Sequence, residues 1–170
     1  MQYTNNTSRV IAVDPGYDRL GIAVLQGYEL LYSECFSPPP GVLAERLKAI
    51  FNHLKKVIVE YKPEALAIET LFFTKNQKTA IQVAEARGVI ELAGAEAGIP
   101  VYEYSPQEVK IAVTGSGNAT KEGVTKMVIK LVSLSAGKRH DDEYDAIALG
   151  IAHQASIKFK KAKRSLEPRA

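Results

Sequence analysis

After a polar stretch, the chain opens with three short apolar runs that have the length and β-branched composition of strands. They cover residues 9–14, 20–26 and 28–36. A Pro-Gly breaker separates the first run from the second, and Gly27 joins the second to the third as tightly as a hairpin turn does. We therefore predict an antiparallel meander of three strands, with Asp14 at the end of the first.

A helix and a parallel strand are predicted next. From Val42 the apolar residues recur every three or four positions, which indicates an amphipathic helix that Pro63 ends. The apolar run 65–68 that follows ends in Glu69. A strand reached through a helix is most naturally laid parallel beside the first strand. Glu69 is therefore expected next to Asp14.

The rest of the chain predicts one more strand among helices. We expect helices at 77–97, 106–113, 120–133 and 141–158, and a strand at 99–104. In the first of these helices, Ala80, Ala84 and Gly88 share one face, which suits close packing in the core or, alternatively, a subunit contact. The predicted fold class is α/β: a mixed five-stranded sheet, an antiparallel meander continued by parallel strands, flanked by helices.

Length and charge indicate one domain with a basic end. A chain of 170 residues with 46% hydrophobic composition suits a single core. We expect a disordered N-terminus at 1–8, a domain at 9–157 and a flexible basic tail at 158–170. The tail holds six basic residues and one acidic residue, which leaves 16 basic and 18 acidic in the rest. Nucleic acid would therefore be bound through local patches, with the tail as a nonspecific arm.

Compartment signals are few. The sequence has no apolar run of membrane-spanning length and no pattern of a cleaved leader. Its single cysteine, Cys35, fits a reducing compartment. We therefore expect a cytoplasmic protein without membrane contact.

A third acidic position completes a candidate site. Asp142 and Asp145 lie three residues apart at the start of the last helix, on one face. Alone, such acids commonly interact only with the helix dipole, and Asp14 alone commonly opens a turn. Four carboxylates at one sheet edge, however, are ligands for hard divalent cations, and such crowding is hard to explain without a cation. Two Mg²⁺ ions there would support phosphodiester hydrolysis, so nuclease chemistry is predicted.

Five motifs, in this order and at these spacings, carry a resemblance to a known family. They are D-P-G at Asp14, A-I-E-T-L-F-F-T-K-N from Ala67, V-A-E-A-R-G-V from Val83, Y-S-P-Q-E-V-K from Tyr104 and D-x-x-D-A-I-A-L from Asp142. Over about residues 9–156 the chain resembles the RuvC Holliday-junction resolvases, within the ribonuclease-H-like superfamily. The D-P-G turn alone is a weak signal, whereas the ordered set is specific.

The resemblance implies an endonuclease that cuts four-way junction DNA as a homodimer, with one symmetric nick per subunit, in recombination and DNA repair. The implied cofactor is Mg²⁺, two ions per site, with Mn²⁺ as a possible substitute. A branch-migration complex of the RuvA–RuvB type is the implied partner. The family's catalytic, metal-binding carboxylates fall on Asp14, Glu69, Asp142 and Asp145, and Lys121 would steady the charged transition state.

The resemblance also implies DNA-binding residues. Phe72 matches an aromatic residue that stacks on bases near the junction centre, but Phe73 beside it is an alternative, and burial is the alternative for either ring. Lys110 and Lys121 match basic residues near the scissile phosphate. Lys75, Lys78 and Arg87 are assigned only generally, to backbone contact or the dimer region.

Two points stay open around the acidic run. Asp141 with Asp145 is an alternative ligand pair, and His140 is within reach of the metals. Two other functions compete with a junction nuclease: a nuclease for RNA or RNA:DNA hybrids, using the same carboxylates, and a DNA-binding protein without catalysis. The aromatic pair and a dimerising helix favour the junction, and four acids at a DNA site argue against binding without a cation.

Overall fold

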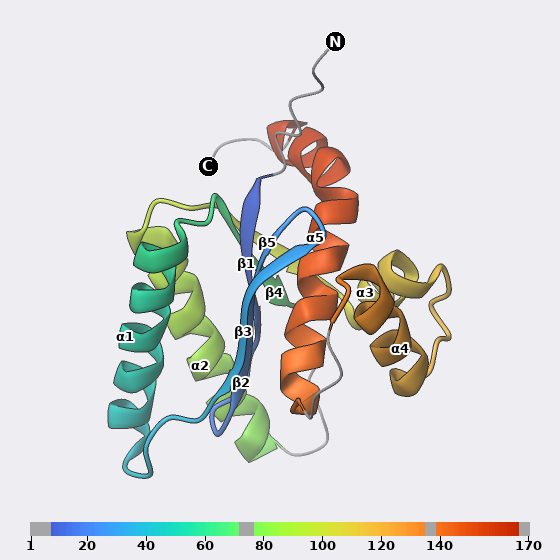
Figure 1. Ribbon diagram of the computed structural model, residues 1–170. Helices are drawn as coiled ribbons and strands as arrows, with labels where there is room; N and C mark the ends of the chain where they lie inside the picture. Colours follow the sequence, from blue (N-terminus) through green and yellow to red (C-terminus); the bar gives the residue numbers. More distant parts are fainter. Residues whose placement is uncertain (1–7, 72–76, 135–138, 167–170) are drawn as a thin grey trace.

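The computed structural model describes residues 8–71, 77–134 and 139–166, and these ranges form five strands and five helices (Figure 1). In chain order the elements are β1 (Arg9–Asp14), β2 (Leu20–Gln26), β3 (Glu29–Phe36), α1 (Leu43–Tyr61), β4 (Ala65–Glu69), α2 (Gln77–Glu96), β5 (Val101–Tyr104), α3 (Pro106–Thr114), α4 (Lys121–Leu131) and α5 (Asp141–Leu166). None of the described helices is both long and apolar enough to cross a membrane.

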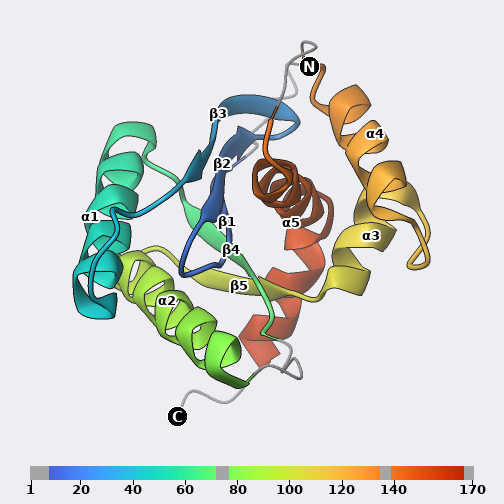
Figure 2. The same cartoon turned by 90° about the horizontal axis from the view of Figure 1, so that it is seen from below.

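The strands form one mixed sheet in the order β3-β2-β1-β4-β5. Strands β1, β2 and β3 pair antiparallel, whereas β4 pairs parallel with β1, and β5 parallel with β4. The predicted five-stranded sheet and the placing of β4 beside β1 are therefore confirmed. Helices α1 and α2 cover one face of the sheet, and α3, α4 and α5 lie on the other (Figures 1 and 2).

Both faces of the central strand β1 are buried, each in its own core. Ile11 and Val13 pack in a cluster with residues of α1 and α2, whereas Val10 and Ala12 pack in a cluster with residues of α5. Successive strand residues point to opposite faces, so a strand covered on both sides is a continuous apolar run. This explains why β1 and β4 lack the alternation of a half-exposed strand.

Helix ends follow the local sequence. Helix α1 ends at Tyr61, where Lys62 takes a left-handed conformation just before Pro63. Helix α3 begins at Pro106 behind a capping box formed by Ser105 and Glu108. Helix α5 extends to Leu166, beyond the end expected near 158, since its basic segment contains good helix formers and no Gly or Pro.

The small-residue face of α2 is buried only in part. Ala80 is buried, as are Ala86, Ile90 and Ala93, whereas Gly88 is exposed and a Cβ there would meet nothing within 4 Å. Core packing is therefore not found at Gly88, and a subunit contact there stays a prediction. The outward side of α2 also presents Ile81 and Leu92, whose exposed fractions are 60% and 57%.

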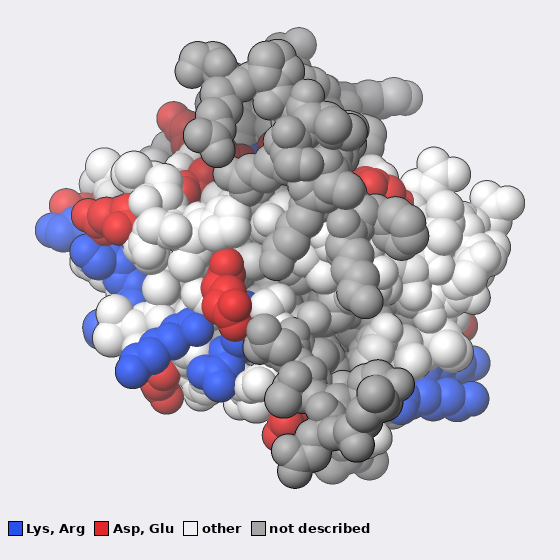
Figure 3. Space-filling view, turned by 90° about the horizontal axis from the view of Figure 1, so that it is seen from above, with Lys and Arg blue, Asp and Glu red and all other residues white. Residues whose placement is uncertain are grey.

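Surface charge is mixed on the end of the molecule where β1 begins. Figure 3 shows Lys and Arg there in separate groups beside acidic residues, among the residues that the structure describes. The carboxylates of the candidate site lie at the opposite end of β1, which faces the viewer in Figure 2.

Helix α5 approaches the sheet closely because a glycine leaves room for it. A Cβ built on Gly21 of β2 would lie only 1.7 Å from the backbone oxygen of Asp142 and 3.2 Å from the Cβ of Ala146. At Gly150, two turns further on, a Cβ would meet Leu25 and Ala12. The first turn of α5 is thereby seated against β2, beside the end of β1.

We expect Gly21→Ala to displace the first turn of α5 and to abolish nuclease activity. Overpacking of this kind costs roughly 1–3 kcal/mol of the free energy of unfolding, which urea denaturation measures. Val128→Ala is the matched control, since it opens a cavity in the buried core under α4 and costs roughly 2 kcal/mol, and Val128 is not among the residues that a Cβ on Gly21 would meet. Full activity in Gly21→Ala would contradict this role of the glycine.

Candidate active site

Four acidic side chains meet at one edge of the sheet. Asp14 ends β1, and Glu69 ends the neighbouring parallel strand β4, where Val13 pairs with Ile68. Asp142 and Asp145 enter from the first two turns of α5. The charges of Glu69, Asp145 and Asp142 all act on Asp14. Three segments distant in sequence thus bring their carboxylates together.

Burial and mutual repulsion raise the pKa values of three of the acids, although Lys121 acts to lower them. Burial is the largest cause that raises the pKa of Asp14, to about 8, and the negative charges of its acidic neighbours raise it further. Burial, and then the charge of Asp145, raise the pKa of Glu69 as well. The pKa of Asp145 is also raised, chiefly by burial, even though Lys121 acts to lower it. Ionising all of these groups therefore costs free energy unless a cation joins them.

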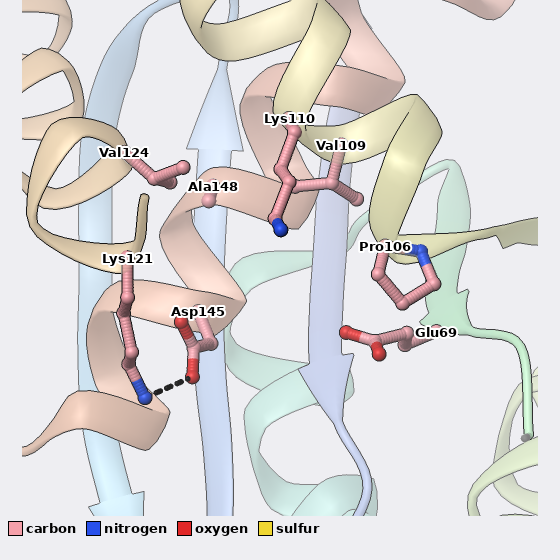
Figure 4. Close-up of a pocket in the computed structure, with 8 residues that line it drawn as sticks. All are labelled: Glu69, Pro106, Val109, Lys110, Lys121, Val124, Asp145 and Ala148. Carbon is pink, nitrogen blue, oxygen red and sulfur yellow. Dashed lines mark ion pairs between the residues drawn. The ribbon is translucent and has the colours of Figure 1, made fainter. Parts of the chain in front are cut away.

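Two basic side chains reach the acids from different elements. Lys121, the first residue of α4, places Nζ 3.1 Å from Asp145 Oδ2 (Figure 4). The same Nζ lies 3.2 Å from Asp141 Oδ2. Thr120 caps this helix by accepting a hydrogen bond from the Gly123 N–H. From the turn between β1 and β2, Arg19 places its guanidinium nitrogen Nη2 3.2 Å from Asp142 Oδ2.

The acids border two hollows. One cavity, of about 280 Å³, is lined by Glu69, Asp145, Lys110 and Lys121 over an apolar wall of Pro106, Val109, Val124 and Ala148. Figure 4 shows the Lys110 amine directed into this cavity and Glu69 across it from Asp145. A second cavity, of about 340 Å³, is lined by Asp14, Pro15, Glu69, Thr70, Leu71, Val83 and Pro106. Glu69 thus stands between two spaces open to a ligand.

The acids flanking Asp142 have different surroundings. Asp141 is 76% exposed and pairs with Lys121, and its charge acts on Asp145. Glu143 is nearly buried and accepts hydrogen bonds from Ser33 Oγ at 2.6 Å and Arg139 Nε at 3.0 Å, which fastens α5 to β3. His140 is exposed and its backbone oxygen accepts the Glu143 N–H. These contacts give Glu143 a structural part, whereas Asp142 pairs with Arg19 and its charge acts on Asp14.

The carboxylate oxygens of the site are the kind of ligand that a hard divalent cation prefers, although these side chains are not arranged around a single point. Within the described ranges, no three Asp, Glu, His or Cys side chains are gathered as metal ligands are. Asp145 and Asp142 are instead turned toward Lys121 and Arg19. Oxygen ligands that are crowded and partly buried, with raised pKa values, match the preference of Mg²⁺ for carboxylates.

The predicted DNA-binding residues are placed unevenly. Lys110 lies at the acids, whereas Phe72, Phe73 and Lys75 fall outside the described residues, as does the side chain of Lys78. The guanidinium of Arg87 is only 12% exposed and pairs with Glu91 at 2.8 Å and Glu103 at 3.1 Å. Arg87 therefore ties α2 to β5, and its contact with the DNA backbone or a second subunit stays a prediction.

Sequence reasoning missed the residues that position α5. Arg19, Cys35 and Gly21 all contact Asp142, with Cys35 Sγ donating to Oδ2 at 3.7 Å. Each of these residues lies more than one hundred positions before Asp142, so no periodicity or motif links it to that residue. The available signal was the position of Arg19, five residues after Asp14 in the same turn.

A mixed sheet whose strand ends and helix start carry a shared group of acids defines the chain as a nuclease of the ribonuclease-H-like class. Residues 10–153 match the family described as crossover junction endodeoxyribonuclease RuvC. The chain belongs to this family, and it is a crossover junction endodeoxyribonuclease that resolves Holliday junctions.

Relatives of the same name support this membership over nearly the full length. The protein of Carboxydothermus hydrogenoformans is 43% identical over 85% of this chain and 94% of its own length. That of Thermotoga maritima is 42% identical over 90% and 94%, respectively.

Solved structures agree. The structure described as T. thermophilus RuvC in complex with Holliday junction substrate superposes with a TM-score of 0.83 at 33% identity, covering 90% of this chain and 96% of that one. The yeast mitochondrial Holliday junction resolvase Ydc2, at 10% identity and a TM-score of 0.64, covering 94% and 85%, shares the fold.

We expect the metal-free protein to lose stability as pH rises from about 4 to about 8. Unfolded Asp14 loses its proton near the ordinary pKa of 3.8, whereas the folded protein holds that proton until about pH 8. The folded state thus binds more protons over this interval, and the free energy of unfolding falls with pH. Asp14→Asn should flatten the profile and be more stable than wild type at pH 8, measured by urea denaturation in EDTA.

Asp18→Asn is the control for this comparison, since Asp18 lies in the same turn but is 63% exposed and pairs with Arg46. This variant should keep the wild-type slope. Addition of Mg²⁺ at pH 8 should stabilise wild type more than Asp14→Asn. Equal slopes for wild type and Asp14→Asn would show that Asp14 is not held protonated.

Proposed function

We propose that this chain cuts Holliday junctions by paired symmetric nicks that depend on Mg²⁺, with Asp14, Glu69, Asp142 and Asp145 as catalytic, metal-binding residues. The observation that carries the proposal is the convergence of these four acids at one sheet edge, in a chain of the RuvC family. Acids this crowded beside a phosphate would repel it unless cations lay between them.

The position of each carboxylate would decide its role in binding metal. Asp14 and Glu69, at adjacent strand ends, would hold and bridge two Mg²⁺ ions, with Mn²⁺ as a substitute. Asp142 and Asp145, on one face of α5, would complete the two sites. Bound Mg²⁺ supplies an activated water and stabilises the leaving oxygen of an in-line displacement. Such cleavage leaves 5′-phosphate and 3′-hydroxyl ends that a ligase can seal.

Lys121 and Lys110 would serve the charged phosphate. The ammonium of Lys121 is 57% exposed while it pairs with Asp145, and Lys110 points into the same cavity. A positive charge fixed beside the reacting phosphate stabilises the charge that develops in the transition state. We therefore place Lys121 at the transition state and Lys110 on the neighbouring DNA backbone.

A homodimer would place two such sites on one junction. Ile81 and Leu92 lie eleven residues apart, so they share the outward side of α2, with exposed Gly88 between them. Two large apolar side chains on one outward face are typical of an interaction surface. We propose this face as the dimer contact. A branch-migration partner of the RuvA–RuvB type and a cytoplasmic location stay predictions.

The first test is cleavage of a labelled synthetic four-way junction beside linear duplex and RNA:DNA hybrid, in Mg²⁺ or EDTA. We expect paired symmetric nicks on the junction alone, lost in EDTA. Asp14→Asn should lose cleavage by at least about a hundredfold, because a metal ligand is removed. Asp18→Asn, in the same turn, is the control and should cut normally.

Each other outcome changes a different part of the proposal. Cutting of the hybrid in preference to the junction would move the substrate to RNA while keeping the metal site. Junction binding without cleavage in any divalent metal would reduce the chain to a binding protein. Normal cleavage by Asp14→Asn would remove Asp14 from the site.

The dimer is tested by replacing Ile81 and Leu92 together with lysine. We expect the mass measured by sedimentation to fall from two chains to one, since buried charges oppose association. Val59→Lys is the matched control, because Val59 is 71% exposed on α1 and outside the proposed contact. A double variant that sediments like wild type would place the contact elsewhere.

A further inference from the structure

Arg19 lies at the edge of the acidic site, and its ion pair with Asp142 uses only one nitrogen of the guanidinium. The side chain is 54% exposed, and Nη2 pairs with Asp142 Oδ2 at 3.2 Å. A guanidinium carries five N–H donors in a planar fork that suits carboxylate and phosphate groups alike. An arginine held in this way can donate to Asp142 and to a second anion at once.

The backbone around Arg19 is held in place. A Cβ on Gly16 would lie 2.1 Å from the backbone oxygen of Arg19, so the turn between β1 and β2 is tightly closed. Leu20, the next residue, is fully buried at the start of β2. The guanidinium is thus presented from a fixed turn beside Asp14.

The basic side chains at the site approach the acids from two different sides. Lys110 and Lys121 approach from α3 and α4, on the side of Asp145. Arg19 approaches Asp142 from the sheet side, where Cys35 of β3 also contacts Oδ2. A DNA strand crossing the acids would therefore meet positive charge on both sides of them.

We propose that Arg19 is a DNA phosphate-binding residue that also positions Asp142. It donates to a backbone phosphate next to the one that is cut, and the same guanidinium keeps Asp142 oriented through Oδ2. The contacts with Arg19 and Cys35 are both made by Oδ2, so the other carboxylate oxygen, Oδ1, takes no part in them. This inference rests on the proposed function, because it needs DNA to lie across the four acids.

The test measures junction binding in EDTA, where affinity is independent of metal and of cleavage. The probe is a fluorescent four-way junction of random sequence, titrated by anisotropy at several salt concentrations. Loss of one phosphate contact lowers the slope of log affinity against log salt by about 1. We expect this loss in Arg19→Gln and recovery of the slope in Arg19→Lys, which keeps the charge.

Lys55→Gln is the matched control. Lys55 is 48% exposed and ion-paired at 2.9 Å, so it resembles Arg19 in exposure and pairing. It lies on α1 and its partner Glu96 lies on α2, on the opposite face of the sheet from α5 (Figure 1). Removal of this charge should leave the salt slope unchanged. A slope in Arg19→Gln equal to that of wild type would overturn the inference, even if cleavage were reduced.

The two proposals fail differently. If wild type cuts the junction and Asp14→Asn does not, while Arg19→Gln keeps the full slope, only the role of Arg19 is lost. If wild type neither binds nor cuts the junction, both the proposed function and the role of Arg19 are lost. A lower slope in Arg19→Gln with normal slopes in Lys55→Gln and Arg19→Lys supports the phosphate contact.

Discussion

Mutual repulsion among buried carboxylates is the constraint on which this structure depends. Asp14 is held where burial and the charges of its acidic neighbours raise its pKa to about 8, so the fold works against its ionisation. Such a group persists only when the surrounding core fixes the backbone that carries it. Here β1 and β4 are buried on both faces, which sets Asp14 and Glu69 side by side regardless of their repulsion.

Helix α5 is the third support, and it is positioned by small residues and one buried acid. Gly21 lets the helix start lie against β2, while Glu143 anchors it to Ser33 of β3. Two adjacent acids thus have different surroundings: Glu143 is nearly buried and satisfies its charge inside the protein, whereas Asp142 pairs with exposed Arg19 and its charge acts on Asp14. The helical rotation between neighbouring residues separates the structural group from the one available to a ligand.

The basic side chains explain how the site stays folded without excess repulsion. Lys121 pairs with Asp141 and Asp145 of α5, and Arg19 pairs with Asp142, while more than half of each basic side chain stays exposed. Because exposed ion pairs contribute little net stability, these cations can be drawn toward phosphate at small cost. The same contacts turn Asp142 and Asp145 aside, which accounts for the absence of a tight ligand group among the described residues.

The sequence by itself determined the order of elements, the mixed sheet and the meeting of Asp14 with Glu69, because strand periodicity and the parallel crossover are local rules. It also determined the family through ordered motifs. Tertiary structure alone decided that Arg87 is held inside the protein, that Gly88 faces outward, and that Arg19, Gly21 and Cys35 contact Asp142. The contacts with Asp142 join segments more than one hundred residues apart, where packing geometry decides which side chains meet and no local sequence pattern predicts them.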